Sequence, residues 1–164
     1  MRVLISTASR HGSTADIGRA IADVLSAEGI DARVAAPEEV ASLDGYDAAV
    51  LGSAVYAGHW MKGMQGMVQR LSAELSRLPV WLFSSGPIGD PPKPEEDPVD
   101  VASIVEAIGA RGHVTFAGRL DRKKLNFGER AIVTAFKAPD GDFRDWDEVK
   151  GWAIGIAYEL KTKV

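Results

Sequence analysis

The apolar positions of this 164-residue chain form two patterns that alternate along the sequence. Short apolar runs without polar interruption predict strands that are buried on both faces, as in a parallel sheet. Between these runs, apolar residues recur every three or four positions, which predicts amphipathic helices. The predicted strands are Val3–Ile5, Ala32–Ala36, Tyr46–Leu51, Val80–Phe83 and His113–Ala117. Ala32–Ala36 alternates instead, which predicts a half-exposed strand at the edge of the sheet.

The predicted helices connect these strands. The first contains Ile17, Ile21 and Leu25 and ends at Gly29, and the last follows a capping box at Asp145–Glu148. The others are a short helical turn over Glu38–Leu43, a helix over Met64–Leu78 that Pro79 stops, a helix with Asp97 as N-cap and Pro98 as first position that Gly109 ends, and a helix over Lys124–Phe136 within the irregular stretch 119–140.

Five strands that alternate with about five helices form repeated βαβ units. Right-handed crossovers then place helices on both faces of a parallel sheet. The length suits one core and the sequence has no internal repeat, so we expect residues 1–164 to form a single domain. The sequence therefore predicts an α/β protein with a five-stranded parallel sheet.

Composition and charge narrow the range of functions. The net charge of −4 gives no reason to expect a nucleic-acid partner, and the absence of cysteine excludes disulfides, cysteine metal sites and thiol catalysis. No metal site is predicted. We find neither a signal peptide nor an apolar run near the roughly 20 residues that span a bilayer, so we expect a cytoplasmic protein. Peripheral membrane contact and the oligomeric state stay open.

Polar or glycine-rich loops, 9–14, 53–60 and 84–90, follow three predicted strands, at the edge where α/β sheets bind ligands. The first loop enters a helix, where unpaired amides and the helix dipole favour a phosphate. It offers hydroxyl donors, a positive charge and a glycine that permits close approach: Ser9, Arg10, His11, Gly12, Ser13 and Thr14. Ordinary capping and turn functions explain these residue types equally well.

The second loop carries Tyr56, His59 and Trp60. Each of them alone is as well explained by packing or by a solvated turn, but their grouping at a strand end favours a flat, phosphorylated cofactor. The first loop has one glycine and no lysine after Gly12, which excludes the GxGxxG and GxxxxGK[ST] motifs. A phosphate would therefore be held by hydroxyls and amides rather than by an ATP-type lysine.

The sequence resembles the flavodoxin-like family, which binds FMN, and is most similar to its branch of flavodoxin-type, quinone-dependent protoporphyrinogen dehydrogenases. The resemblance is carried by SRHGST at 9–14, GSAVYAGHW at 52–60, FAG at 116–118 and WDEV at 146–149. It implies a flavodoxin-like three-layer sandwich with sheet order 2-1-3-4-5. It also implies that Ser9–Thr14 hold the FMN phosphate and that two segments line the isoalloxazine: Ser53, Ala54, Val55, Tyr56, Ala57, Gly58 and His59 on one side, and Ser84, Ser85, Gly86, Pro87, Ile88 and Gly89 on the other.

The resemblance implies two functions. In an FMN-dependent oxidoreductase, the flavin takes a hydride or two electrons from a small organic substrate and passes them to a quinone. In a flavodoxin-type electron-transfer protein, single electrons pass between protein partners, and Glu95–Asp97 is a docking face, although a solvated loop explains these acids more simply. A phosphoryl-accepting receiver domain shares the strand order, but it needs acidic residues where this chain has Ser6-Thr7 and Ser53. These residues exclude a receiver domain.

Two stretches differ from the dehydrogenases. Their segment after the fifth strand is rich in aromatic and basic residues, whereas Arg119–Arg130 is basic but has Phe127 as its only aromatic residue. Pro91–Asp100 is acidic, whereas its counterpart in the dehydrogenases is basic. We expect Arg119–Arg130 to lie near the open edge of the flavin and to attract an anionic substrate or a lipid surface, although a solvated helix face explains its charge equally well.

Overall fold

The protein is a three-layer α/β sandwich, as predicted. The computed structural model describes residues 1–86, 98–120, 141–142 and 144–162. Its parallel strands are β1 (Arg2–Ala8), β2 (Asp31–Ala35), β3 (Ala48–Tyr56), β5 (Val80–Ser85) and β6 (Gly112–Phe116). They lie in the order β2-β1-β3-β5-β6, which is the predicted order 2-1-3-4-5 for five parallel strands. A short sixth strand, β4 (His59–Trp60), pairs antiparallel with β3.

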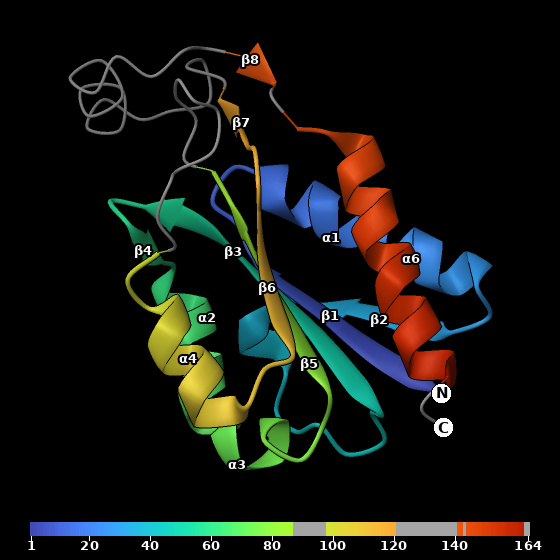
Figure 1. The fold of residues 1–164 in the computed structure, drawn as a ribbon. Coiled ribbons are helices and arrows are strands. Elements are labelled where there is room, and N and C mark those ends of the chain that lie inside the picture. Colours follow the sequence, from blue (N-terminus) through green and yellow to red (C-terminus); the bar gives the residue numbers. More distant parts are fainter. Residues whose placement is uncertain (87–97, 121–140, 143, 163–164) are drawn as a thin grey trace.

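Helices cover both faces of the sheet (Figure 1). One face carries α1 (Ser13–Ala27) and α6 (Trp146–Thr162). The other carries the 3-10 turn η1 (Pro37–Glu39), α2 (Lys62–Arg70), α3 (Ser72–Leu75) and α4 (Val101–Ile108). Because successive side chains of a strand point to opposite faces, Val3 and Ile5 pack beneath α1 while Leu4 packs on the opposite side. This two-sided burial explains why β1 is apolar without alternation.

The edge position predicted for the second strand is confirmed. β2 pairs only with β1 in the sheet, and Arg33 and Val34 are exposed. Asp31 receives hydrogen bonds from Arg33 and from Arg2 of the neighbouring strand, at 2.8 and 2.9 Å. Charged side chains on an edge strand discourage pairing with another chain.

Two strands run further than predicted. β3 continues from the expected end at Leu51 to Tyr56, and β5 continues from Phe83 to Ser85. The polar residues at these ends remain in the sheet, with Ser53 opposite Ser84. Their hydroxyl groups find partners inside the protein, so the change from apolar to polar residues does not end either strand. The loops predicted at 53–60 and 84–90 therefore start later.

The glycine at position 52 has a packing function that the sequence pattern did not reveal. A Cβ atom there would lie 2.1 Å from Phe83 Cζ on the adjacent strand. The Phe83 ring packs against Phe116 and Trp152, with ring centroids 5.8 and 6.0 Å away. Gly52 thus lies inside β3, beyond the predicted strand end at Leu51, at a position where the aromatic ring of Phe83 packs against the backbone.

Several helix boundaries also differ from prediction. α4 begins at Val101 with Asp100 as N-cap, so the predicted start at Asp97-Pro98 is wrong. The carbonyl of Pro98 instead accepts a hydrogen bond from the Val101 amide at 3.1 Å, which forms a turn ahead of the helix. The helix predicted over 64–78 is divided at Leu71 into α2 and α3, and the turn predicted over 38–43 is the shorter η1.

The predicted N-cap of the last helix is confirmed. Asp145 Oδ1 accepts hydrogen bonds from the amides of Asp147 and Glu148, both at 3.1 Å. Before this helix, β7 (Arg119–Leu120) pairs antiparallel with β8 (Gly141–Asp142). The helix predicted over Lys124–Phe136 lies outside the described residues, as does most of Arg119–Arg130.

Candidate functional site

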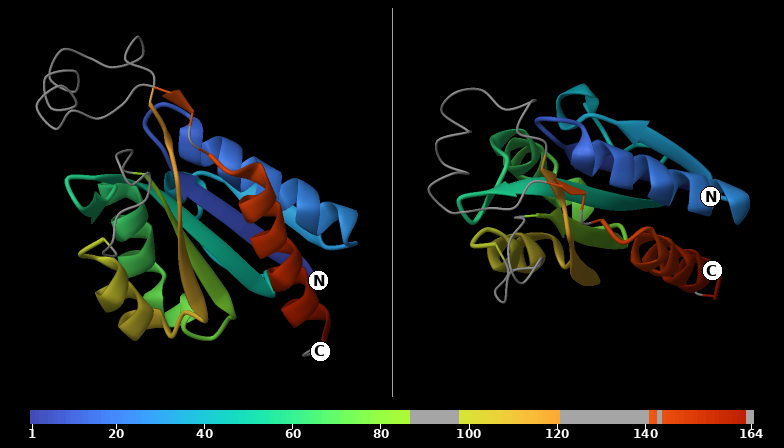
Figure 2. Two further views of the ribbon diagram at one scale, coloured as in Figure 1. Left: turned by 45° about the horizontal axis from the view of Figure 1, so that its top comes forward. Right: turned by 90° about the horizontal axis from the view of Figure 1, so that it is seen from above.

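The carboxyl ends of the parallel strands lie together at one edge of the sheet, at the top of Figure 1. The starts of α1 and α6 and the β7–β8 pair lie at the same end, which Figure 2 shows from two further directions. This edge therefore collects most of the described residues that the sequence singled out.

The first loop has the geometry of a helix N-terminus open to an anion. Gly12, the N-cap of α1, has φ +87°, which favours glycine, and its amide donates to Ser9 Oγ at 3.0 Å. Its carbonyl accepts the Asp16 amide at 3.0 Å. The amides of Ser13, Thr14 and Ala15, in the first helical turn, consequently have no intrahelical acceptor.

A buried polar atom in this loop lacks a partner. Ser13 Oγ is inaccessible to solvent and has no hydrogen-bond partner among the described residues. Thr14 beside it is only 1% exposed. A buried hydroxyl without a partner costs roughly 1–3 kcal/mol, and an acceptor such as a phosphate oxygen would remove that cost. The residues of the loop thus fit a phosphate group.

The second predicted segment meets the first at Tyr56. The guanidinium of Arg10 lies over the Tyr56 ring, 5.3 Å from its centroid. Tyr56 is 39% exposed, at the end of β3. A flat ligand at this edge would thus find an aromatic ring next to the first loop.

Residues 57–60, predicted as loop, form a tight β-hairpin turn and its second strand. Ala57 and Gly58 have φ of +51° and +80°, and two such residues in succession are typical of type I′ hairpin turns. The turn pairs Tyr56 with His59 and Val55 with Trp60. Ala is rare at positive φ, so the sequence lacked the usual Asn-Gly or Asp-Gly signal for this hairpin.

His59 pairs with a carboxylate that the sequence analysis did not select. Its Nδ1 lies 3.2 Å from Asp100 Oδ2, and the His59 side chain is 53% exposed. The same oxygen accepts the Trp60 amide at 2.9 Å. Asp100 stood at the end of the acidic Pro91–Asp100 stretch, and nothing in the sequence separated it from the other acids there.

Trp60, Ser84 and His113 form a hydrogen-bonded chain across the sheet. The buried indole of Trp60 donates from Nε1 to Ser84 Oγ at 2.8 Å, and Ser84 Oγ lies 2.8 Å from His113 Nε2. Ser53 is also fully buried, with its Oγ donating to the Ala54 carbonyl and accepting the Met61 amide. Because both serine hydroxyls have protein partners, a flavin beside these segments would meet mainly their backbone.

The third predicted segment is described only in part. The Gly86 amide donates to the Phe116 carbonyl at 3.0 Å, and Gly86 has φ +75°. Ser85 is the last residue of β5 and is buried. The predicted site residues Pro87, Ile88 and Gly89 lie outside the described residues.

Arg144 is a charged residue near the first loop that the sequence analysis missed. Its side chain is 6% exposed, and its Nη1 lies 3.2 Å from Asp16 Oδ2 and 3.4 Å from the Ser13 carbonyl oxygen. Burial raises the pKa of Asp16, but hydrogen bonds from Arg19 and Arg144 outweigh it, so the net pKa lies below its usual value. No sequence pattern linked residues so far apart.

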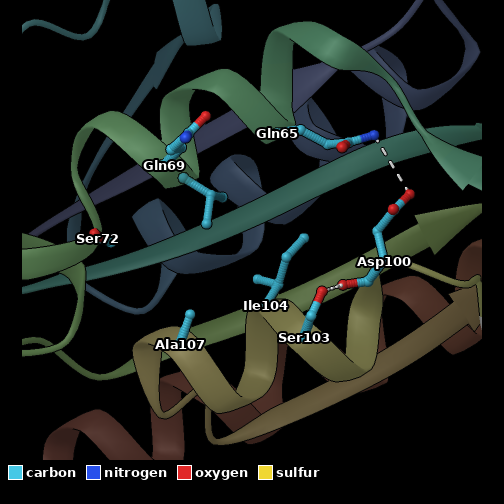
Figure 3. A pocket seen from close by; sticks show the side chains of 8 residues that line it. Gln65, Gln69, Ser72, Asp100, Ser103, Ile104 and Ala107 are labelled. Atoms are coloured by element: carbon cyan, nitrogen blue, oxygen red, sulfur yellow. Dashed lines mark hydrogen bonds between the residues drawn. The ribbon is translucent and has the colours of Figure 1, made fainter.

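A separate groove of about 390 Å³ lies between α2 and α4. Figure 3 shows Gln65 of α2 directed toward Asp100, at 3.4 Å, with Ser103 and Ile104 along the facing helix. The groove follows the outer helices rather than the strand ends, and none of its lining residues belongs to the first loop.

Comparisons with known proteins give the same fold. The chain is 23% identical to protoporphyrinogen IX dehydrogenase [quinone] of Escherichia coli, over 96% of each chain. A flavodoxin from the domain Archaea superimposes with a TM-score of 0.66 at 18% identity, covering 98% of this chain and 99% of that one. Rubredoxin oxygen:oxidoreductase of Desulfovibrio gigas gives 0.65 at 16% identity, covering 99% of this chain but 36% of that larger one.

None of the helices in the described part of the chain has the length and apolar character of a membrane-spanning segment.

The family model for the flavodoxin domain matches residues 4–147, which include the first loop, the hairpin and the start of α6. This match indicates a flavin cofactor. The chain belongs to the flavodoxin domain family.

Proposed function

We propose that this protein is an FMN-dependent oxidoreductase that takes two electrons from a small organic substrate and passes them to a quinone. The observation that supports FMN binding is the buried Ser13 Oγ beside the first amides of α1, which has no hydrogen-bond partner in the part of the chain that the structure describes. FMN ends in a phosphate, and this loop offers hydroxyls and amides to a phosphate without an ATP-type lysine.

In this proposal the three segments have different tasks. Ser9–Thr14 bind the phosphate, and Tyr56 with the hairpin at 57–59 lines the isoalloxazine. The backbone around Ser53 and Ser84–Gly86 forms the wall at the strand ends. When bound, FMN supplies the capacity to accept a hydride or electrons, while the protein orients it and sets its electrostatic surroundings.

The positive charge beside Tyr56 favours two-electron chemistry. The Arg10 guanidinium lies over the Tyr56 ring, and His59 is paired with Tyr56 across the hairpin. Fully reduced FMN tends to be an anion, so neighbouring positive charge stabilises it. The similarity to the E. coli dehydrogenase supports a quinone as acceptor and protoporphyrinogen as the first substrate to test.

The alternative is an electron-transfer protein of flavodoxin type. It is supported by the archaeal flavodoxin, which this chain matches over almost the full length of both proteins. Such a carrier would exchange single electrons with protein partners and would need no small organic substrate.

Spectroscopy and a reductive titration test the proposal. The purified protein should show flavin absorbance, and the flavin released by heat should be FMN by mass. Reduction should proceed in a single two-electron step, and the protein should reduce a water-soluble quinone with protoporphyrinogen IX as donor. Two well-separated one-electron steps without quinone reduction would favour the carrier, and failure to bind FMN would reject both functions.

A further inference from the structure

Arg144 connects the start of α1 to the segment that enters α6. Its Nε and Nη2 donate to Asp142 at 2.8 and 2.6 Å, and its Nη1 donates to Asp16 at 3.2 Å. The guanidinium also lies 4.7 Å from the centre of the Trp146 ring. A side chain that is 6% exposed and held from three sides has little freedom to move.

Asp16 poses an electrostatic problem for the proposed phosphate site. It lies in the first turns of α1, and its carboxyl, whose net pKa is lowered, is ionised at neutral pH. A carboxylate close to a phosphate dianion repels it and opposes the favourable helix dipole. An additional positive charge beside Asp16 would cancel this repulsion.

Two arginines pair with Asp16, but their surroundings differ. Arg19 is 59% exposed, so water and salt screen its charge. Arg144 is buried, and its Nη1 also lies 3.4 Å from the Ser13 carbonyl oxygen. It therefore touches the residue whose hydroxyl lacks a partner. The Arg144 contact is part-buried, since the Asp16 side chain is itself 40% exposed, and it is less screened than the contact with Arg19, so it is the stronger candidate for compensating the Asp16 charge.

We propose that Arg144 is a positioning residue for the phosphate of the flavin: it fixes the Asp16 carboxylate and the Ser13 carbonyl at the start of α1 and, with a charge that it shares between Asp142 and Asp16, reduces the repulsion between Asp16 and the phosphate. This inference rests on the proposed function, because it assumes that the phosphate binds at Ser9–Thr14. It adds a residue from a distant part of the sequence to that site.

The experiment compares FMN with riboflavin, which is the same flavin without the phosphate. Dissociation constants for both are measured with apoprotein by quenching of flavin fluorescence, at low and high salt. Arg144→Met should weaken FMN binding about fivefold or more, with less effect on riboflavin. Adding Asp16→Asn to this variant should restore FMN affinity to near wild type. The control Arg19→Met, which removes the exposed partner of the same carboxylate, should have a much smaller effect.

Asp16→Asn alone keeps the test valid if Arg144→Met does not fold. With Arg144 intact and the carboxylate neutralised, FMN should bind more tightly while riboflavin binding stays unchanged. A loss of FMN and riboflavin affinity alike in Arg144→Met, without rescue by Asp16→Asn, would mean that Arg144 acts only on stability and would overturn the inference.

The proposed function has a separate criterion. If the wild-type protein binds FMN no better than riboflavin, the phosphate site itself is wrong, and the inference on Arg144 falls with it. If wild type prefers FMN but none of the Arg144 and Asp16 variants changes that preference, only the inference on Arg144 is wrong.

Discussion

The indole nitrogen of Trp60 donates a hydrogen bond of 2.8 Å to Ser84 Oγ, which joins the short antiparallel strand β4 to the parallel strand β5. Both residues are buried, so this bond fixes the hairpin against the sheet. Ser84→Ala should cost about 1–3 kcal/mol, because the indole N–H would be buried without an acceptor. In a Trp60→Phe background the same change should cost clearly less. Urea unfolding of the four proteins gives the coupling energy, and a value near zero would contradict the role of the bond.

Substitution of glycine by alanine should have opposite effects in β3 and in α6. Gly52→Ala should destabilise the protein by about 1–3 kcal/mol, because its Cβ would meet the Phe83 ring at 2.1 Å. Gly155→Ala is the control: a Cβ there has no described atom within 4 Å, and alanine favours helix by about 0.5–1 kcal/mol. Thermal unfolding measures both changes. An equal loss of stability in the two variants would argue against the specific clash.

Ser13→Ala should separate ligand affinity from stability. The apoprotein should be as stable as wild type or more so, because a buried hydroxyl without a partner is removed. FMN binding should weaken about tenfold, since a hydrogen bond to a charged phosphate is worth roughly 1.5–3 kcal/mol. Thermal unfolding of the apoprotein and fluorescence titration with FMN measure the two effects. Unchanged FMN affinity would show that this hydroxyl does not face the phosphate.

The carboxylates that pair with Arg144 should make stability sensitive to acid. Hydrogen bonds from Arg144 lower the pKa of Asp142. Partial burial raises the pKa of Asp16, but hydrogen bonds from Arg19 and Arg144 outweigh this effect and lower it. A carboxyl with a lower pKa in the folded state adds stability above its unfolded pKa, and this stability is lost as the pH falls through the folded pKa.

The test compares unfolding free energies of wild type and Arg144→Met across pH. Their difference should be constant above about pH 5 and should shrink as the pH falls below about 4. Urea unfolding at a series of pH values measures it. A difference that stays the same down to pH 2 would mean that Arg144 stabilises the fold without its carboxylates.

His59→Gln should lower the reduction potential for the second electron of bound FMN. A histidine cation near the reduced flavin stabilises its negative charge, and glutamine keeps a polar side chain without that charge. Potentiometry of both proteins under the same conditions measures the change. Potentials that coincide would remove the electrostatic support for two-electron chemistry.

Local patterns were sufficient to place the five parallel strands, although not the ends of β3 and β5, and the order of the strands was implied by the family resemblance. The unbroken apolar run at Val3–Ile5 predicted a strand buried on both faces, and Asp145 predicted the start of the last helix. They were not sufficient where a contact from another element decides the structure. Ser53 stays in a strand because Met61 and Ala54 satisfy its hydroxyl. Gly52 is explained by a ring on β5 that no local pattern could indicate.

The position of the first loop in the candidate site was predicted from local patterns, but two residues that contact the site were missed. The first loop lies where the βαβ pattern placed it, at the start of α1. Asp100 and Arg144 were missed because their roles come from contacts with residues 41 and 128 positions away, His59 and Asp16. Sequence spacing carries no information on such pairs when only one sequence is considered.

The antiparallel pairing of β7 with β8 places Leu120 opposite Gly141. The backbone pairing therefore holds together the two residues that flank positions 121–140. Backbone pairing does not depend on which side chains a strand carries, and the cost of bringing two chain positions together rises only slowly with the number of residues between them. Insertions between positions 121 and 140 should therefore be tolerated far better than insertions into the parallel strands.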